Sequence, residues 1–333
     1  MNEILVQLAK IVVILGGLLT TAALMSLAER KVSAWMQYRI GPNRVGPFGL
    51  LQPLADGVKF IFKEEVVPAG ANPVLFRLAP AIAALPAMLT VAVIPFAGDV
   101  VLFGKSFGRL SIADVDVGIL YLLAIGSMGV YGVILGGWAS NSKYSLLGGL
   151  RASAQMISYE LTLILTILAV IVLAGSLDLR AIADAQPTIG SWIVWKQPLA
   201  FLLFVIATFA ETNRHPFDFA ECEPELVGGF HTEYSAMKFA LFFLGEYAAM
   251  TVMACLTTTL FLGGPSVPFL PHAHWALGFA AFLAKTSMFL FLFIWVRWTL
   301  PRFRFDQLMG IGWKVFLPLA LLNLVATGVV VSW

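Results

Sequence analysis

The sequence predicts an all-α polytopic membrane protein with eight transmembrane helices. Of its 333 residues, 59% are hydrophobic and only 12% are charged, and the mean hydropathy is +0.88. These values lie far outside the balance of a soluble domain. Apolar runs of about 20 residues, the length that crosses a bilayer core as a helix, recur along the chain. They are continuous and rich in Leu, Ala and Ile, whereas a β-barrel would show short segments of alternating character.

A single membrane domain is expected over residues 1–333. The expected spans are residues 4–28, 76–97, 117–138, 153–174, 193–210, 236–262, 276–298 and 312–332. The first span differs from a signal peptide, because its opening MNEILVQ lacks a basic region and the charges ERK follow the apolar run. We therefore expect a retained helix that enters the membrane with its N-terminus outside.

The distribution of Lys and Arg predicts the orientation. The connections after the first, third, fifth and seventh spans hold 15 basic residues, and those after the second, fourth and sixth hold 4. By the positive-inside tendency, the basic connections face the cytoplasm, or the matrix of an organelle. Both termini are then expected on the outer, periplasmic side of a bacterial inner membrane, or on the corresponding side of an organelle inner membrane.

The sequence contains no pattern typical of a resident cofactor. Cys222 and Cys255 form no CxxC pair, and the four histidines lack metal-ligand spacing. There is no GxGxxG motif or P-loop. A net charge of +2 gives no indication of nucleic-acid binding. We expect no metal, flavin, iron–sulfur cluster or nucleotide on this chain, so that electrons for any redox reaction would come from a partner.

The long connection after the first span predicts an amphipathic helix over residues 50–63. GPNRVGP forces turns, and the following LLQPLADGVKFIFKE places apolar residues at spacings of three and four with Asp56, Lys59 and Lys63 elsewhere. Such a helix lies along the membrane surface. It is either a simple surface anchor or the wall of a cavity at membrane depth.

An unpaired charge within a membrane span costs several kcal/mol. Glu160, Glu246 and Lys285 lie well inside expected spans, whereas Lys10 is close enough to the end of its span for its side chain to reach the membrane surface. Burial favours the protonated form of a carboxyl group, so Glu160 and Glu246 are candidates for proton transfer, with structural hydrogen bonding as the alternative. For Lys285 an ion pair with a carboxylate is an open alternative to a functional role.

An acidic inner loop covers residues 211–234, ETNRHPFDFAECEPELVGGFHTEY, between the fifth and sixth spans. Six of the 19 acidic residues lie in it: Glu211, Asp218, Glu221, Glu223, Glu225 and Glu233. Pro224 and Glu225 suit the first turn of a short helix, which explains Glu223 and Glu225 as acids near a helix start. Crowded carboxylates also titrate as a coupled set suited to proton transfer. A solvated acidic loop is the simpler alternative.

Four long segments resemble one known family. They are MQYRIGPNRVGPFGLLQPLADGVKFIFKEEVVP, SAQMISYELTL, ETNRHPFDFAECEPELVGGFHTEYSAMKFALFFLGEY and RWTLPRFRFDQLMGIGWKVFLPLAL. Over nearly the whole chain the sequence is similar to the NuoH family, a membrane component of respiratory complex I, which is the proton-translocating NADH:quinone oxidoreductase.

The resemblance implies a subunit that is not catalytic alone and that forms much of the chamber through which ubiquinone or menaquinone reaches its reduction site. It implies partners among the other complex I subunits, especially the quinone-site subunits of the hydrophilic arm and the adjacent small membrane subunits, together with membrane lipid. Residues matching the family's quinone path are Arg39, Asp56, Lys59, Arg297 and Arg302. Residues matching its proton path are Glu160, Glu211, Asp218, Glu221, Glu223 and Glu246, with Arg214 as their charge partner. Glu225 and Glu233 match family acids without an assigned role.

Two other functions remain open at the level of sequence. One is the membrane anchor of a related energy-converting hydrogenase or of a ferredoxin- or F420-linked complex, although the full GPNRVGP to KEEVVP segment argues for a quinone-linked complex. The other is a self-sufficient ion transporter. Transporters often carry inverted repeats with broken helices, and the sequence shows no convincing internal repeat.

Overall fold

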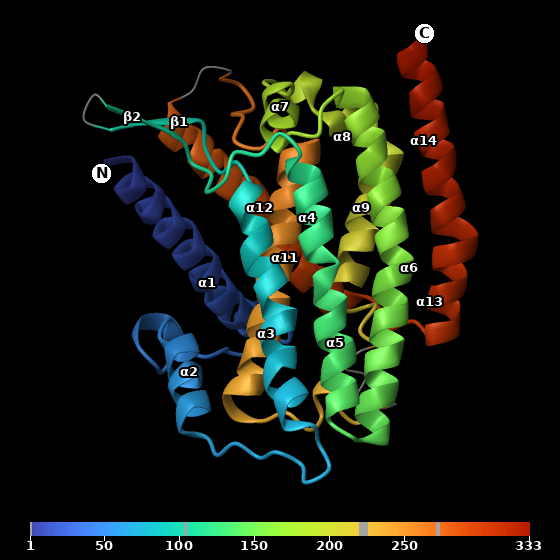
Figure 1. The fold of residues 1–333 in the computed structure, drawn as a ribbon. Helices are drawn as coiled ribbons and strands as arrows, with labels where there is room; N and C mark the ends of the chain where they lie inside the picture. Colours follow the sequence, from blue (N-terminus) through green and yellow to red (C-terminus); the bar gives the residue numbers. More distant parts are fainter. Residues whose placement is uncertain (1, 103–104, 220–225, 271–273) are drawn as a thin grey trace.

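A computed structural model describes residues 2–102, 105–219, 226–270 and 274–333. The chain forms a bundle of long helices with both termini at one end, which we call the terminal end (Figure 1). The long helices are α1 (Asn2–Met36), α3 (Pro73–Thr90), α6 (Lys143–Ala174), α11 (Ala236–Phe261), α12 (Trp275–Thr299) and α14 (Leu317–Ser332), and the shorter ones are α2 (Gln52–Phe62), α4 (Gly118–Gly126), α5 (Met128–Ala139), α7 (Leu179–Asp184), α8 (Ile193–Lys196), α9 (Pro198–Glu211) and α13 (Phe305–Ile311).

The described residues contain seven helical segments that are long and apolar enough to cross a membrane. The chain is therefore a mostly helical, multi-pass membrane protein, as predicted. Three segments are composite, because α3, α4 and α13 each continue into another helical element. The fifth predicted span, 193–210, is divided between α8 and α9, and α9 at 14 residues is about 21 Å long. Because α9 is shorter than a bilayer core, the count of eight spans stays a prediction.

One small β element accompanies the helices at the terminal end. Strands β1 (Asp99–Leu102) and β2 (Lys105–Arg109) form an antiparallel pair in which Asp99 lies opposite Arg109. Adjacent Val100 and Val101 favour an extended backbone. The strands are far shorter than a membrane-crossing run, so the sequence predicted only a connection here. The all-α prediction therefore describes the spanning helices, and the hairpin is an addition to it.

Small residues bring α3 close to both of its neighbours. A Cβ atom at Gly132 of α5 would lie 2.4 Å from the backbone nitrogen of Ala83, and one at Gly245 of α11 would lie 2.9 Å from the Cα atom of Ala84. Glycine is thus required on both sides of α3. Close backbone approach through small residues is the usual basis of helix packing in membranes.

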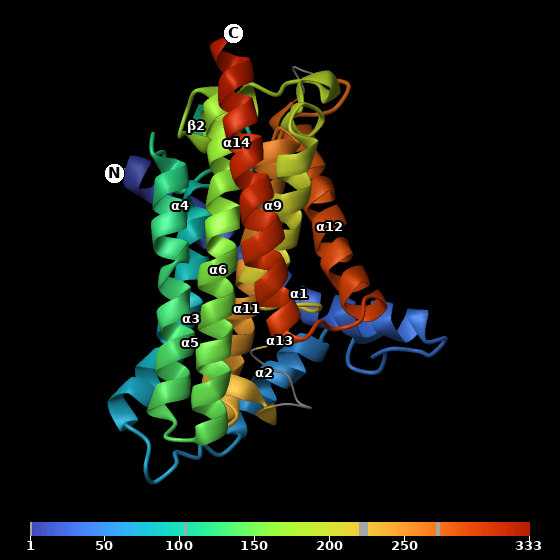
Figure 2. The same cartoon turned by 90° about the vertical axis from the view of Figure 1, so that its right-hand side faces the viewer.

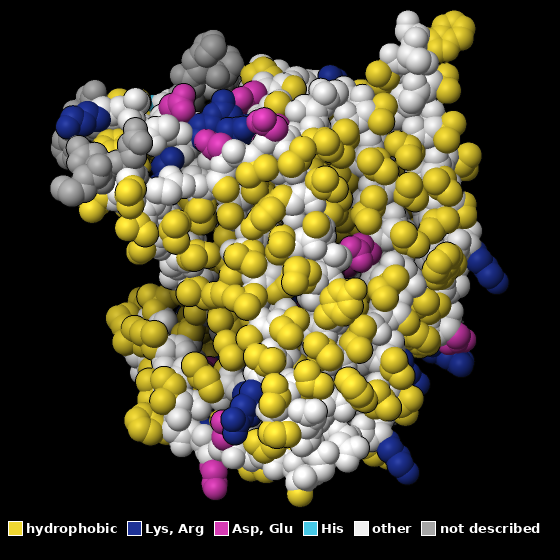
Figure 3. Space-filling model, in the orientation of Figure 1, with side chains coloured by type: hydrophobic (Ala, Val, Ile, Leu, Met, Phe, Trp, Pro, Cys, Tyr) yellow, Lys and Arg dark blue, Asp and Glu magenta, His cyan; other side chains and the backbone are white. Residues whose placement is uncertain are grey.

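Hydrophobic side chains cover the middle of the visible face, and most charged side chains lie toward its two ends (Figure 3). The view turned by 90° shows α14 lying along α6 and α9 (Figure 2). Only 11% of the apolar window of the segment Phe305–Ser332 is buried within the chain. This distribution is that of a bundle whose outer surface meets lipid or other membrane proteins.

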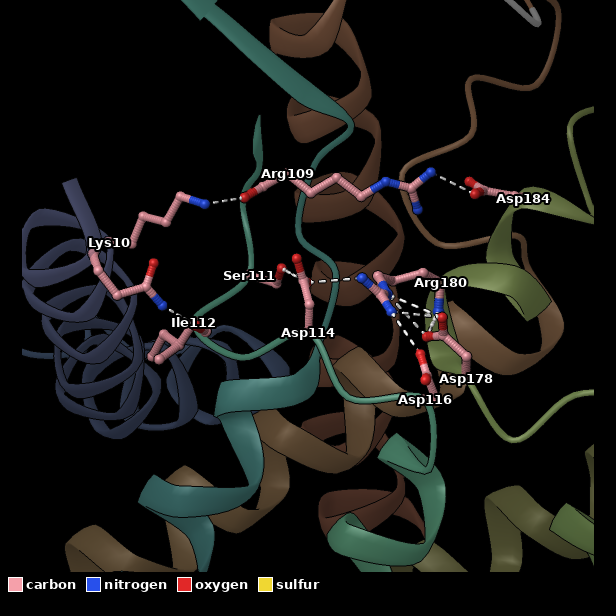
Figure 4. A network of polar contacts seen from close by, with 10 residues as sticks. Lys10, Arg109, Ser111, Ile112, Asp114, Asp116, Asp178, Arg180 and Asp184 are labelled. Carbon is pink, nitrogen blue, oxygen red and sulfur yellow. Dashed lines mark hydrogen bonds and ion pairs between the residues drawn. The ribbon is translucent and has the colours of Figure 1, made fainter. Parts of the chain in front are cut away.

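Ion pairs join the connections at the terminal end (Figure 4). Arg180 of α7 lies 2.9 Å from Asp178, 3.3 Å from Asp114 and 3.6 Å from Asp116, and Arg109 lies 2.6 Å from Asp184. The hydrogen bond to Asp178 is the main cause that raises the pKa of Arg180. These ion pairs join α7 and the residue just before it to strand β2 and to the connection that precedes α4.

Candidate functional site

A large cavity of about 590 Å³ lies between α1, α2, α11 and α12. Its walls combine apolar residues such as Phe60, Phe239 and Phe243 with polar side chains. The charged and hydroxyl residues that line it are Ser26, Glu29, Arg30, Ser33, Arg39, Asp56, Tyr247 and Arg297. Its volume and its mainly apolar lining with a few polar groups are typical of a small-molecule site.

A small cavity of about 110 Å³ lies deeper in the bundle. Residues of α3, α4, α5, α6 and α11 and the end of α9 line it. Glu211 and Glu246 supply its two carboxyl groups, Thr90, Thr212 and Asn213 supply the other polar side chains, and the remaining residues are apolar. The small cavity is therefore an apolar space with two titratable groups at its wall.

Arg214 connects the two cavities. Its side chain is only 4% exposed, and its Nε atom lies 2.5 Å from Oε1 of Glu246. Its Nη1 atom donates a hydrogen bond of 3.2 Å to Oε2 of Glu29, which lines the large cavity. The guanidinium also lies 4.4 Å from the ring centroid of Tyr247. A single buried cation thus pairs with one carboxylate of each cavity.

Glu29 was not among the predicted site residues. Besides Arg214, it accepts a hydrogen bond of 2.7 Å from the Tyr247 hydroxyl and lies 2.5 Å from Nη1 of Arg297. In the sequence, Glu29 closes an apolar run and precedes Arg30 and Lys31, so it resembles an ordinary flanking charge. The structure extends α1 to Met36, which places Glu29 inside the helix and 7% exposed. The sequence could have indicated Glu29 only if the helix had been expected to continue past the apolar run, since that continuation buries the carboxylate.

Glu160 and Glu211 lie close enough to interact electrostatically across α6 and α9. Atom Oε2 of Glu211 is buried and has no hydrogen-bond partner among the described residues. Glu160 is half-buried. The structure thus places two predicted proton-path acids, Glu211 and Glu246, at the small cavity, and a third, Glu160, within electrostatic range of Glu211.

Asp218 and Arg302 form a separate pair outside the spanning helices, with Nη2 of Arg302 3.2 Å from Oδ2 of Asp218. Two histidines share this region. Burial lowers the pKa of His231 to about 4, against the opposing charge of Asp218. Burial also lowers the pKa of His215, and the nearby cation of Arg302 acts in the same direction. Both histidines are therefore neutral at pH 7.

Of the other predicted quinone-path residues, two line the large cavity and one does not. Arg39 and Asp56 line the large cavity, and Asp56 lies 2.8 Å from Nη1 of Arg30. Lys59 is exposed on α2 and does not contribute to the lining of the described cavities. The amphipathic helix is α2, and it packs against α1 and α11 while Leu54, Val58, Ile61 and Phe62 remain exposed. It forms both a cavity wall and an apolar outer face.

Lys285 binds backbone carbonyl groups. Its Nζ atom donates to the carbonyl oxygens of Leu262 at 2.7 Å, Gly264 at 3.1 Å and Ser266 at 2.6 Å. It also lies 4.8 Å from the ring centroid of Trp192. Within the described ranges its polar partners are therefore oxygens of the connection just beyond α11, in place of the carboxylate that the sequence left open.

Some predicted residues lie outside the described part of the chain. Glu221, Glu223 and Glu225 fall in residues 220–225, so their roles stay predictions. Glu233 is half-buried and lies shortly before the start of α11. Among the described residues, no group of three or more His, Cys, Asp or Glu side chains is arranged to hold a metal ion.

Comparison with known proteins decides the family. The family model described as NADH dehydrogenase matches residues 9–328. The chain belongs to this family. A curated NADH-quinone oxidoreductase subunit from Geobacter metallireducens is 56% identical over 98% of this chain and 96% of its own length. The corresponding NADH-quinone oxidoreductase subunit of Thermomicrobium roseum is 51% identical over 96% and 94%. NADH-quinone oxidoreductase subunit 8 of Rhodothermus marinus is 52% identical over 95% of each chain.

Proposed function

We propose that this chain is the membrane subunit of a proton-translocating NADH:quinone oxidoreductase that receives the quinone and passes the effect of its reduction to the membrane. The large cavity is the quinone path, and the acids around the small cavity are the start of the proton path. The observation that carries the proposal is Arg214, which pairs with Glu29 at one cavity and with Glu246 at the other.

The large cavity has the chemistry that a quinone requires. A quinone has an apolar tail and a headgroup with two carbonyl oxygens, and its reduction takes up two protons. Phe60, Phe239 and Phe243 provide apolar wall, and Arg39 and Arg297 provide donors for carbonyl oxygens. We assign ubiquinone or menaquinone as the substrate. The electrons come from a partner subunit.

Electrostatics give the coupling between the cavities a physical basis. A buried cation between two carboxylates is attracted to both. When one carboxylate is protonated, its attraction for the cation is lost, and the cation interacts mainly with the carboxylate that stays ionised. Uptake of a proton by Glu29 when the quinone is reduced would release Arg214 toward Glu246. The closer cation stabilises the carboxylate form of Glu246, and the altered electric field changes the proton affinity of Glu211, the other carboxyl group of the small cavity, which interacts with Glu160.

The proposed setting is a bacterial inner membrane, with other subunits of the complex as partners. Both termini lie at the same end of the bundle, and the ion pairs at that end include Arg109 and Arg180 from the sparsely basic connections (Figures 1 and 4). The bias of Lys and Arg toward the other connections supports a terminal end on the periplasmic side. Quinone-site subunits of the hydrophilic arm are then partners at the opposite end.

The relatives favour this function over a hydrogenase anchor, because proteins named as NADH-quinone oxidoreductase subunits match along almost their full length. An independent transporter requires proton movement by this chain alone. Reconstitution of the purified chain into vesicles distinguishes that function, since the proposed subunit moves no protons without its partners.

Obstruction of the large cavity tests the proposal. Ala23→Phe places a ring at the cavity wall, and Gly16→Phe on the exposed part of the same helix is the matched control. In the intact complex, we expect Ala23→Phe to lower NADH-driven quinone reduction roughly tenfold or more while NADH oxidation by an artificial acceptor that bypasses the quinone is retained. The control should retain both activities. Unchanged quinone reduction in an assembled Ala23→Phe complex would contradict the assignment of the cavity.

A further inference from the structure

The turn between Glu211 and Arg214 joins the two halves of the site. Glu211 is the last residue of α9 and lines the small cavity, whereas Arg214 pairs with Glu29 and Glu246. Only two residues separate them. The position of this turn therefore sets where the carboxyl group and the guanidinium lie relative to each other.

One side chain from α6 binds the turn. Gln155 is fully buried, and its Nε2 atom donates a hydrogen bond of 2.8 Å to the carbonyl oxygen of Ala210 and one of 3.3 Å to Oδ1 of Asn213. The last carbonyl groups of a helix lack partners within the helix. The Ala210 carbonyl accepts from the backbone nitrogen of Asn213 at 3.3 Å, and Gln155 adds a side-chain donor to it. Residues on both sides of Glu211 are thus held by the same amide.

Asn213 gives the turn its shape. Its φ is 50°, in the left-handed region that asparagine tolerates better than most residues and that commonly ends a helix. Its Nδ2 atom lies 3.4 Å from the sulfur of Met156, which lines the small cavity beside Asn213. Two consecutive residues of α6, Gln155 and Met156, therefore contact the side chain that turns the chain from Glu211 toward Arg214.

We propose that Gln155 is a positioning residue for proton transfer. By holding the end of α9, it fixes the position of the Glu211 carboxyl group relative to the Arg214 guanidinium. This inference rests on the proposed function. Gln155 has no titratable group and is not among the residues that line either cavity, so it acts through the two residues to which it donates hydrogen bonds. A shift of about 1 Å in a reacting group lowers a rate by up to about a hundredfold, which is why a buried amide at this turn has a measurable effect.

The chain offers a matched control in Gln186. It is 1% exposed, and its Nε2 atom donates to the carbonyl oxygens of Ile182 at 3.1 Å and Leu260 at 3.0 Å, near the terminal end of α11. Gln186 thus anchors helix ends as Gln155 does, away from both cavities. Methionine replaces glutamine with a side chain of similar length, so Gln155→Met and Gln186→Met lose the same polar group.

The test is proton uptake driven by NADH in vesicles containing the intact complex, measured from about pH 6 to 9. We expect Gln155→Met to lower the number of protons moved per NADH about tenfold and to displace the pH profile relative to the wild type, since Glu211 loses its fixed position among Glu160, Glu246 and Arg214. NADH oxidation by the artificial acceptor should be unchanged. Gln186→Met should leave the proton count and the profile as in the wild type.

A wild-type count and profile for Gln155→Met, or equal losses in both variants, would overturn the inference. Should Gln155→Met not assemble, Asn213→Gly takes its place, because glycine accepts the left-handed backbone and removes only the side chain that Gln155 binds. A wild-type profile for Asn213→Gly then overturns the inference, and a displaced one supports it. Glu211→Gln separates the two proposals: if this variant pumps normally, the proposed function itself fails.

Discussion

The Nε atom of Arg214 lies 2.5 Å from Oε1 of Glu246, and both side chains are largely buried. Taking two charges out of water is costly, and only good geometry with further polar partners offsets that cost. Glu29 and the ring of Tyr247 supply those partners for Arg214. The pair therefore belongs to a network whose parts depend on one another.

Replacement of Arg214 should destabilise the protein. Arg214→Met leaves Glu29 and Glu246 without their shared cation, and removal of one partner from a buried pair costs roughly 3–5 kcal/mol. Thermal unfolding of the purified complex measures the effect. Arg304→Met is the control, because Arg304 pairs with Asp306 where both side chains are mostly exposed. Equal melting temperatures for the two variants would contradict a central role for Arg214.

Lys285 should contribute to stability and not to pumping. Lys285→Met removes the donor for three carbonyl oxygens beyond α11, and loss of a charged hydrogen-bond donor costs roughly 1.5–3 kcal/mol. Hydrogen exchange at residues 262–266 should become faster, while the protons moved per NADH stay as in the wild type. The exposed Lys196→Met is the matched control. A lowered proton count in assembled Lys285→Met would place Lys285 on the proton path instead.

The neutral His231 predicts a loss of stability in acid. Its pKa is lowered by burial to about 4, so between the unfolded value of about 6.5 and pH 4 the unfolded chain binds more protons. The contribution of His231 is complete above about pH 6.5 and is lost as the pH falls, by up to roughly 3 kcal/mol. Melting temperatures of the wild type should therefore fall more steeply from about pH 6.5 to 4.5 than those of His231→Gln.

The exposed His274→Gln serves as the comparison for His231→Gln. It should follow the wild-type curve over the same pH range. Parallel curves for all three proteins would show that His231 is protonated in the folded state or accessible to water.

Hydropathy and charge predicted the helical membrane fold, because bilayer thickness dictates the length of apolar runs. They did not predict the β1 and β2 hairpin, whose strands are too short for that signal. The sequence could name Glu246 as a candidate, because a charge inside an apolar run is conspicuous. It could not name Glu29, because only the continuation of α1 to Met36 buries that carboxylate. The carbonyl partners of Lys285 come from the residues just beyond α11, which pack beside α12. No local sequence pattern predicts that contact between two helices.

In the proposed function, the Arg214–Glu246 pair transmits the effect of quinone reduction to the proton path. The Glu246→Gln variant isolates this step, since the amide keeps the size of the side chain and removes its charge and its titratable proton. In vesicles containing the intact complex, we predict that NADH-driven proton uptake falls roughly tenfold or more, while NADH oxidation by the artificial acceptor is unchanged. An assembled Glu246→Gln complex that moves the wild-type number of protons per NADH at the wild-type rate would contradict the account.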